Sequence, residues 1–416
     1  MSGLYASNSG SLVQVQQGRD RSIFKPSHQA CKDTPVAPNY VYVQRSTSLP
    51  SVWSGSETFT DFELPQSLGV VDQLIVRFQV SVSNNSVVLP PTPFWCSRVE
   101  EYIGQDLLTT TYANEQYNES VGFLNTTELE QMATAMNLAG GSATSTYGNG
   151  TIGQGTSYFY LPLAASAFNT MNPCVAGFTA KLRVRLYFPS SIIASGTGTI
   201  SLTDCYIIAR ELKSSNLEGV VRAHQHGVVD YNMIVRERQL DQTTLTSGTT
   251  TPLYLRSFKN DSAGLLVYIT NQSPSNADLY KRYSIQDVQL LDQTNNRLTE
   301  IIRQDFNAPF VWTDAVESAF TTALGVGDEG SSSTSHYNHV MVLPFSADFK
   351  KTALTGCDYG KYPLSTLEKL QITPDPNTMN GTGLGAVAVY TISYSYGHVV
   401  VRDGKHFIQM SSTSGR

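Results

Sequence analysis

The sequence predicts an all-β protein built from two consecutive jelly rolls, each a sandwich of eight antiparallel strands. The chain of 416 residues is too long for one comfortable hydrophobic core. Apolar and polar residues alternate over many short segments, which is typical of half-buried strands. One ordered series of motifs also occurs twice, about 185 residues apart. We expect an N-terminal arm (1–45), a first jelly roll (46–213), a linker (214–227), a second jelly roll (228–408) and a C-terminal tail (409–416).

The first 45 residues are polar, contain Pro26, Pro35 and Pro38, and show no sustained periodicity. This predicts an arm and not a packed element. Its charged residues are mainly basic: Arg19, Arg21, Lys25, Lys32 and Arg45, against Asp20 and Asp33. The arm is either a solvated tail or a segment that docks on neighbours or on an anionic layer.

Two segments of the first half show the clearest strand periodicity. Residues 70–82 predict an inward face of Leu74, Val76, Phe78, Val80 and Val82. Residues 178–188 predict an inward face of Ala180, Leu182, Val184, Leu186 and Phe188. Most of the alternate positions are polar, so each segment predicts an antiparallel strand with one wet face.

Each half then contains a hairpin followed by an amphipathic helix. The hairpins are predicted at 98–110, turning near Gly104, and at 284–302, turning near Asn295 and Asn296. The first helix is expected within 126–141, with a capping box formed by Thr127 and Glu130. Its apolar stripe is Leu129, Met132, Ala133 and Met136. The second is expected within 313–325, capped by Thr313, with the stripe Val316, Ala319, Phe320 and Ala323.

A Gly/Ser-rich loop follows each helix, at 140–157 and 325–335. Next comes a strand with a Leu-Pro pair and a phenylalanine: Leu161, Pro162 and Phe168 in the first half, Leu343, Pro344 and Phe349 in the second. Closing strands at 196–213 and 383–401 end the two halves. Long connections without helical crossovers fit Greek-key jelly rolls.

Composition excludes several classes of protein. Charged residues make up 15% of the chain and the net charge is −6, which argues against a nucleic-acid binder that depends on a basic domain. The cysteines are odd in number and scattered, which predicts reduced thiols: Cys31, Cys96, Cys174, Cys205 and Cys357. The N-terminus does not resemble a secretory signal, and no apolar run reaches the roughly 18 residues of a membrane span.

Motifs that could carry chemistry have simpler interpretations. Gly148, Gly150 and Gly153 form G-x-G-x-x-G, but the motif follows a predicted helix and precedes a strand, so a flexible loop is favoured over a dinucleotide site. Adjacent strand residues face opposite sides, so Glu100 and Glu101 cannot act together as a glycosidase pair. We expect both, with nearby Asp106, to be solvated strand charges.

The histidines could suggest zinc, yet a site needs three or four donors. His224 and His226 lie in the expected linker, and His336 and His339 enter a strand on opposite faces. We therefore expect surface or interface histidines and no zinc site. His398 and His406 add no spacing that changes this expectation. Without a signal, no glycans are expected on the sequons at Asn84, Asn118, Asn125, Asn149, Asn260, Asn271 and Asn380. The sequence thus predicts no catalytic, cofactor-binding or metal-binding residue, and no enzyme.

The hairpin, helix, loop and Leu-Pro series in both halves, over residues 46–408, resembles the double jelly-roll major capsid proteins of tailless icosahedral DNA viruses. These include membrane-containing phages, adenoviruses, virophages, polinton-like viruses and large DNA viruses. The resemblance implies a structural protein, made in the host cytoplasm, that assembles as a pseudo-hexagonal homotrimeric capsomer of the virion shell. It also implies contacts with neighbouring capsomers, penton and minor capsid proteins and an inner membrane. No cofactor and no sequence-specific nucleic acid are implied.

A carbohydrate-binding β-sandwich, such as a viral receptor-binding spike, is the alternative. Trp53, Trp95 and Trp312 could stack on sugar rings. Trp95 lies in an apolar segment and Trp312 opens a predicted helix, which favours core or interface positions for them.

Overall fold

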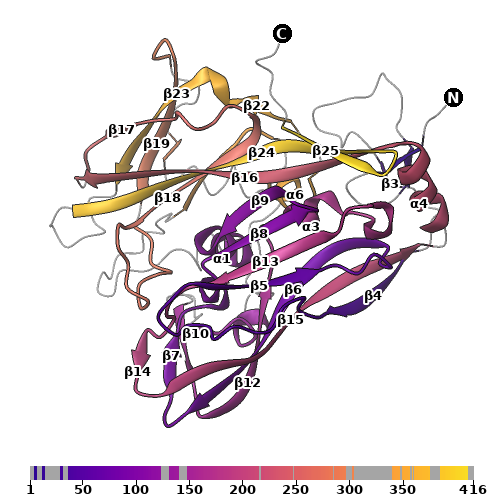
Figure 1. Cartoon of the computed structure of the whole chain (residues 1–416). Coiled ribbons are helices and arrows are strands. Elements are labelled where there is room, and N and C mark those ends of the chain that lie inside the picture. The colour runs from indigo at the N-terminus through magenta and orange to yellow at the C-terminus, as the bar shows by residue number, and fades with distance from the viewer. Residues whose placement is uncertain are drawn as a thin grey trace.

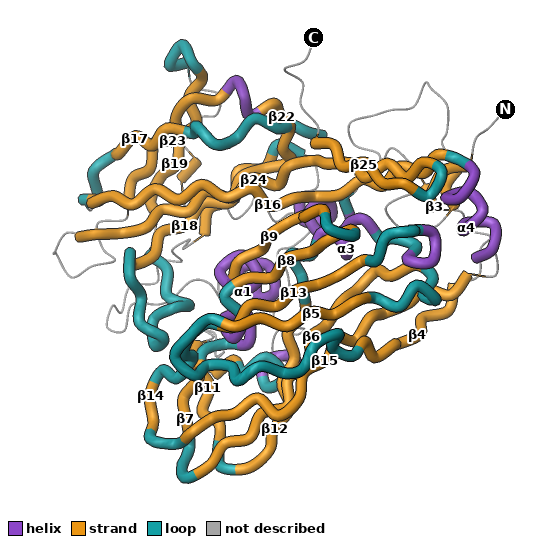
Figure 2. The backbone as a smooth tube through the Cα atoms, in the orientation of Figure 1, coloured by secondary structure: helices purple, strands orange, loops and turns teal. Residues whose placement is uncertain are grey.

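The computed structural model describes most of the chain as antiparallel sheets with a few short helices (Figures 1 and 2). The described residues are 4–6, 12–14, 29–30, 36–122, 131–139, 148–214, 217–246, 248–283, 285–296, 302–303, 340–346, 349–356, 358, 360–374 and 385–410.

The first jelly roll consists of two four-stranded sheets. One has the order β12-β6-β15-β4 and is formed by β4 (Val36–Val43), β6 (Val70–Ser83), β12 (Gly155–Pro162) and β15 (Thr199–Ser214). The other has the order β5-β13-β8-β9 and is formed by β5 (Thr58–Glu63), β8 (Arg98–Ile103), β9 (Asp106–Tyr112) and β13 (Leu182–Phe188).

A third sheet of short strands lies at one end of this jelly roll, with the order β10-β11-β7-β14. Its strands are β7 (Val87–Leu89), β10 (Leu138–Ala139), β11 (Gly148–Ile152) and β14 (Ser195–Gly196). Near the N-terminus, β1 (Leu4–Ala6), β2 (Leu12–Gln14) and β3 (Gln29–Ala30) form a separate three-stranded sheet.

The second jelly roll repeats the same strand order. Its first sheet is β16-β24-β18-β21, formed by β16 (Val228–Leu245), β18 (Asp261–Asn271), β21 (Val340–Pro344) and β24 (Gly385–Arg402). Its second is β17-β23-β19-β20, formed by β17 (Thr251–Tyr254), β19 (Ile285–Asp292), β20 (Ile302–Arg303) and β23 (Leu367–Pro374). The added strands β22 (Tyr362–Pro363) and β25 (Lys405–Met410) pair with β18 and β24. The predicted fold, two consecutive eight-stranded jelly rolls, is confirmed.

The apolar residues that alternate along β6 and β13 face the core. The five inward residues predicted for β6 are all 2% exposed or less, and the four predicted within β13 are fully buried. The predicted hairpins are present: β8 and β9 turn at Gly104, where φ is +65°, and β19 and β20 pair with a turn at Asn295 between them, where φ is +61°. Positive φ at these positions favours glycine and asparagine.

Short helices gather where the two jelly rolls meet. They are α1 (Ala113–Gly122), α3 (Ala167–Met171) and α6 (Phe349–Thr355), with the 3₁₀ turn η1 (Thr92–Trp95). Phe168 and Phe349, the matching phenylalanines of the duplication, lie in α3 and α6. The other 3₁₀ turns are η2 (Val175–Gly177) and η3 (Leu364–Thr366).

Helix α1 is not predicted by the sequence, and it precedes the first predicted helix, at 126–141, of which residues 131–133 are helical. α1 starts directly after β9, because the Glu115 carboxylate accepts a hydrogen bond from the Tyr112 amide at 2.7 Å, as in a capping box. Residues 131–133 are also helical, and Met136 is buried. Thr127, Leu129 and Glu130 lie outside the described residues, as do the second predicted helix and the loop at 325–335.

The ends of the predicted arm and linker also form regular structure. Residues 36–43, assigned to the arm, form β4 and pair with β15. In the predicted linker, residues 217–226 form helix α4 (Leu217–His226). Figure 1 shows α4 at the edge of the molecule, beside the far ends of β16 and β24. These ends complete the first core with Val229, Tyr231, Met233, Val399 and Val401. The two jelly rolls therefore share apolar packing.

Candidate functional site

The junction between the two jelly rolls contains a buried ion pair. Glu119 of α1 accepts two hydrogen bonds from Arg236 of β16, at 2.9 Å from Nε and 2.8 Å from Nη2. The side chains are 1% and 0% exposed. Burial acts to lower the pKa of Arg236, but the attraction of Glu119 outweighs it and holds the pKa above its ordinary value. Two parallel bonds of this kind fix orientation as well as distance.

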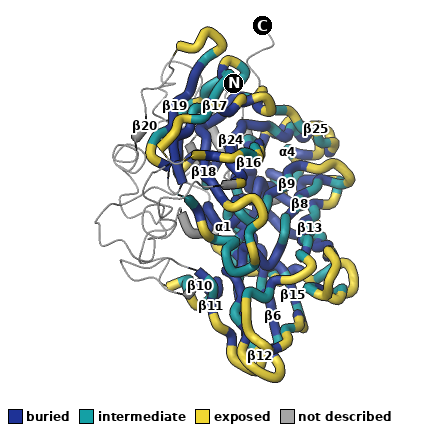
Figure 3. The backbone as a smooth tube through the Cα atoms, turned by 90° about the vertical axis from the view of Figure 1, so that its left-hand side faces the viewer, coloured by how far each residue is buried: buried dark blue, intermediate teal, exposed yellow. Residues whose placement is uncertain are grey.

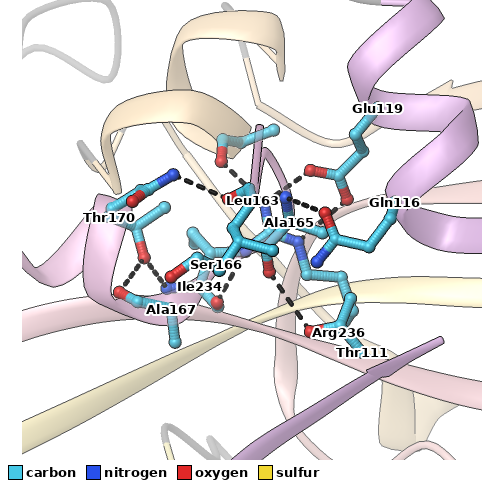
Figure 4. A network of polar contacts seen from close by, with 12 residues as sticks. Thr111, Gln116, Glu119, Leu163, Ala165, Ser166, Ala167, Thr170, Ile234 and Arg236 are labelled. Atoms are coloured by element: carbon cyan, nitrogen blue, oxygen red, sulfur yellow. Dashed lines mark hydrogen bonds and ion pairs between the residues drawn. The ribbon is translucent and has the colours of Figure 1, made fainter. Parts of the chain in front are cut away.

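Arg236 also connects a third element to the same point. Its Nη2 donates to the carbonyl of Ala353 in α6 and its Nη1 to the carbonyl of Ile234, both at 3.0 Å. Figure 4 shows Glu119 and Gln116 projecting from α1 into this network. The Gln116 Oε1 accepts the Ala165 amide at 3.3 Å. Polar groups from both jelly rolls are thus joined without contact with solvent.

Glu101 caps helix α3 beside this network. Its Oε2 accepts the amides of Ala167 at 2.8 Å and Phe168 at 3.3 Å, and its Oε1 accepts the Ser166 hydroxyl. Burial raises the pKa of Glu101 to about 7, although these donors act to lower it. The prediction of a solvated charge is wrong for Glu101, because the first amides of α3 need an acceptor in the core. Glu100 does face outward, where it contacts Arg98 at 3.2 Å.

Helix α3 is connected to β16 in turn. The Ile234 amide donates to the Thr170 Oγ1 at 3.1 Å, and the Thr170 hydroxyl donates to the Ala167 carbonyl at 2.9 Å. The chain of contacts therefore runs from β8 through α3 into the second jelly roll.

The first turns of α1 carry a second set of buried polar side chains. Glu115 is buried, and burial raises its pKa to about 8. Among the described residues, its Oε1 has no hydrogen-bond partner. Arg282 donates to the Oδ1 atoms of Asn114 at 2.7 Å and Asn118 at 3.3 Å. Its guanidinium lies 4.9 Å from the ring of Tyr268. The buried helix face of α1 is therefore largely polar.

An apolar cluster surrounds these polar groups. It consists of Phe94, Tyr117, Met136, Leu138, Ile234, Ala263, Leu266, Tyr268, Val340, Val342, Phe349, Ala353, Ile392, Tyr394 and Tyr396. The cluster takes residues from both jelly rolls, so their relative position is fixed by packing as well as by hydrogen bonds.

Helix α4 is fixed through His224. The Nδ1 of His224 contacts the Val220 carbonyl at 2.7 Å, so Nδ1 is the donor and Nε2 accepts the Tyr231 hydroxyl at 2.5 Å. The Tyr231 oxygen accepts the Cys174 amide at 3.1 Å. Burial lowers the pKa of His224. His224 is fully buried within the chain, so the prediction of a surface or interface position is wrong for it, whereas His226 is exposed.

The remaining candidates from the sequence have structural roles or lie outside the described part. Gly148 and Gly150 belong to β11 and not to a flexible loop; a Cβ at Gly150 would come 2.2 Å from the Asn137 Oδ1. His398 faces Asp230 at 3.5 Å, and His406 contacts Asp106 at 2.8 Å. His336 and His339 lie outside the described residues.

The two described tryptophans that could stack on sugars pack in the first core, Trp95 fully and Trp53 partly buried. Trp95 is fully buried and donates to the Pro90 carbonyl at 2.8 Å. Trp53 packs edge-on against it at 5.7 Å between ring centroids. Both rings therefore pack against other core side chains, and Trp312 is not among the described residues.

The described residues supply little of the other chemistry considered. Within the described ranges, no three His, Cys, Asp or Glu side chains are grouped so that they could hold a metal ion. Cys96, Cys174 and Cys205 are buried free thiols, and burial raises the pKa of Cys174 to about 11. None of the helices in this part of the chain is long and apolar enough to cross a membrane.

The duplicated strand order and the fused junction define a double jelly roll, and comparison with solved structures agrees. A chain of the PBCV-1 virus capsid has a TM-score of 0.64 at 11% identity, covering 93% of this chain and 99% of its own. The Faustovirus major capsid protein has 0.55 at 9% identity, covering 92% of each chain. The mavirus major capsid protein has 0.55 at 9%, covering 90% of each. No protein-family model and no curated protein matches the chain. The chain has the fold of these capsid proteins.

Proposed function

We propose that this protein is the major capsid protein of a tailless icosahedral DNA virus, a structural protein without catalytic activity. Three copies form a pseudo-hexagonal capsomer, and capsomers form the virion shell. The observation that carries this proposal is the duplication itself: two jelly rolls of identical strand order are fused by a buried ion pair and shared packing. A rigid chain with two equivalent units supplies six similar positions when three copies close into a ring.

The neighbouring structures support the same proposal, since they come from viral capsids. The partners we propose are further copies of this chain in the trimer, adjacent capsomers, penton and minor capsid proteins, and an inner membrane beneath the shell. The basic residues of the first 45 positions are suited to contact with an anionic layer.

The proposal is tested on the purified full-length protein. Light scattering after size exclusion should give the mass of three 45.5 kDa chains, and negative-stain electron microscopy should show pseudo-hexagonal particles. A glycan array run in parallel should show no binding. A protein that remains monomeric up to millimolar concentration, and that binds a sugar, would overturn the capsid proposal in favour of a carbohydrate-binding sandwich.

A further inference from the structure

The outward face of the sheet β12-β6-β15-β4 carries a row of tyrosines around one arginine. The guanidinium carbon of Arg77 in β6 lies 4.1 Å from the ring centroid of Tyr158 in β12 and 5.0 Å from that of Tyr206 in β15. Arg77 also donates a hydrogen bond to the Tyr206 hydroxyl. Tyr42 of β4 packs edge-on against Tyr206, with ring centroids 5.2 Å apart. The row crosses all four strands.

This row is open to solvent in the single chain. Tyr42 is 60% exposed and Tyr158 is 48% exposed. Among the described residues Arg77 has no carboxylate partner and its Nε has no acceptor, whereas Arg210 on the same face is paired with Asp72 at 2.7 Å. Tyrosine and arginine are enriched at the centres of protein interfaces, where charge networks are depleted. The face therefore has the composition of an interface but no partner among the residues that the structure describes.

The equivalent sheet of the second jelly roll, β21-β18-β24-β16, uses the same chemistry. Tyr268 and Tyr390 stack with centroids 4.9 Å apart, and the guanidinium of Arg238 lies 5.7 Å from the Tyr390 ring. Here the face is covered: α1 and η1 of the first jelly roll place Tyr117 and Phe94 in the cluster that contains Tyr268. Figure 3 shows the result, with β18 buried along nearly its whole length.

One of two equivalent Tyr/Arg faces is thus covered within the chain, and the other is left open by the described residues. We propose that the exposed face around Arg77 is covered by the second jelly roll of a neighbouring copy, as the first jelly roll covers the face around Tyr268. The docking rests on the proposed function, and the face around Arg77 is the surface that would close the trimer. A contact between two different faces is head-to-tail, and such a contact repeats until the ring closes.

The chemistry of the partner surface follows from Arg77. A guanidinium that loses its water without gaining an anion is costly. The neighbouring copy must therefore present a carboxylate opposite Arg77, just as α1 presents Glu119 to Arg236 inside the chain. The surrounding tyrosines give apolar area and hydroxyl groups at the same surface.

Charge reversal with a matched control tests the proposal. The variants are Arg77→Glu and the pair Tyr42→Ser with Tyr158→Ser. The control is Arg183→Glu: Arg183 lies on the outward face of β13, stacks 4.4 Å from the Tyr102 ring and also has no carboxylate partner among the described residues. Sedimentation at several concentrations should give the mass of three chains for the wild type and for Arg183→Glu. Both test variants should give the mass of one chain, with an unchanged circular dichroism spectrum.

A photo-crosslinker at position 158 tests the same contact without introducing a charge into it. Benzoylphenylalanine in place of Tyr158 should join peptides from residues 228–410 of another copy. Crosslinks to the first jelly roll of another copy, or a trimeric Arg77→Glu variant, would overturn this docking mode and leave the trimer intact. A monomeric Arg183→Glu variant would also overturn it. A wild-type protein that is always monomeric would overturn both this inference and the proposed function.

Discussion

Glu119 and Arg236 form a two-point ion pair that joins helix α1 of the first jelly roll to strand β16 of the second, and neither side chain is more than 1% exposed. The pair lies inside an apolar cluster, and Arg236 also bonds to α6 through the Ala353 carbonyl. It therefore sets the orientation of the two jelly rolls, and with it the geometry of any ring built from them.

Removal of the charge on Glu119 should be strongly destabilising. Glu119→Gln keeps the side-chain shape but leaves Arg236 buried without an anion, which typically costs about 3–5 kcal/mol. The free energy of unfolding in urea measures the effect. Glu57→Gln is the matched control, because the Glu57–Arg98 pair is partly exposed at 44% and 26%, and its loss should cost less than about 1 kcal/mol.

The double variant Glu119→Met with Arg236→Met separates charge burial from packing. Since both charges are removed together, its loss of stability should be smaller than that of Glu119→Gln alone. Equal losses for Glu119→Gln and Glu57→Gln would contradict the central role of the buried pair.

The cap on α3 is tested at Glu101. Glu101→Ala removes the acceptor of the Ala167 and Phe168 amides, and buried donors without an acceptor cost about 1–3 kcal/mol. Glu101→Gln retains an acceptor oxygen and should lose less. The partly exposed Glu63, paired with Lys181, provides the control Glu63→Ala, which should leave the thermal midpoint nearly unchanged. A midpoint for Glu101→Ala equal to that of the control would refute the capping role.

Glu115 should make stability depend on pH. Burial raises its pKa from the ordinary 4.5 to about 8, so between these values the folded protein holds a proton that the unfolded chain has released. Its contribution is therefore complete below about pH 4.5 and is lost as the pH rises towards 8. Glu115→Gln cannot ionise, so its stability relative to the wild type should increase from pH 5 to pH 8.

The comparison variant for this titration is Glu100→Gln. Burial acts to raise the pKa of Glu100, but hydrogen bonds from Tyr102, Tyr187 and Arg98 outweigh it and lower the pKa. The stability that Glu100 contributes is lost as the pH falls below 4.5. The difference between Glu100→Gln and the wild type should therefore change only in that range, and in the opposite direction with pH. Urea unfolding at each pH gives both differences, and a flat difference for Glu115→Gln from pH 5 to pH 8 would rule out the raised pKa.

Packing of α4 against η2 is tested at Gly177. A Cβ there would lie 2.5 Å from the Cγ of His224, whose ring is held by Tyr231 and Val220. Gly177→Ala should therefore cost about 1–3 kcal/mol, as for other overpacked sites. Gly153→Ala is the control, since no atom lies within 4 Å of its Cβ position. Thermal melts of the two variants should differ by several degrees, and identical melts would argue against close packing of α4.

Local pattern was enough to find much of the fold. Leu74 to Val82 and Leu182 to Phe188 alternate because one face of each strand lies in the core. The turns at Gly104 and Asn295 and the duplicated Leu-Pro strands were also visible. Helix α1 was missed because its buried residues include Asn118 and Glu119, which look like a solvated face in the sequence. The Tyr112–Glu115 capping box was the one local signal for it.

The site could not be found in the same way. Glu101, His224 and Arg236 have no spacing that distinguishes them from surface residues, and their partners lie 65, 7 and 117 positions away in the chain. Gly148 and Gly150 lie in a strand because Gly148 pairs with β10 and Gly150 pairs with β7, although the segment has the composition of a loop.

The sequence by itself determined the two jelly rolls, because the period of apolar residues and the turn residues act over a few positions along the chain. The tertiary structure alone decided which charges are buried, how the jelly rolls are joined and which sheet face remains open. A charge can leave water only where a partner is already in place, and the partner of Arg236 is supplied by the other jelly roll.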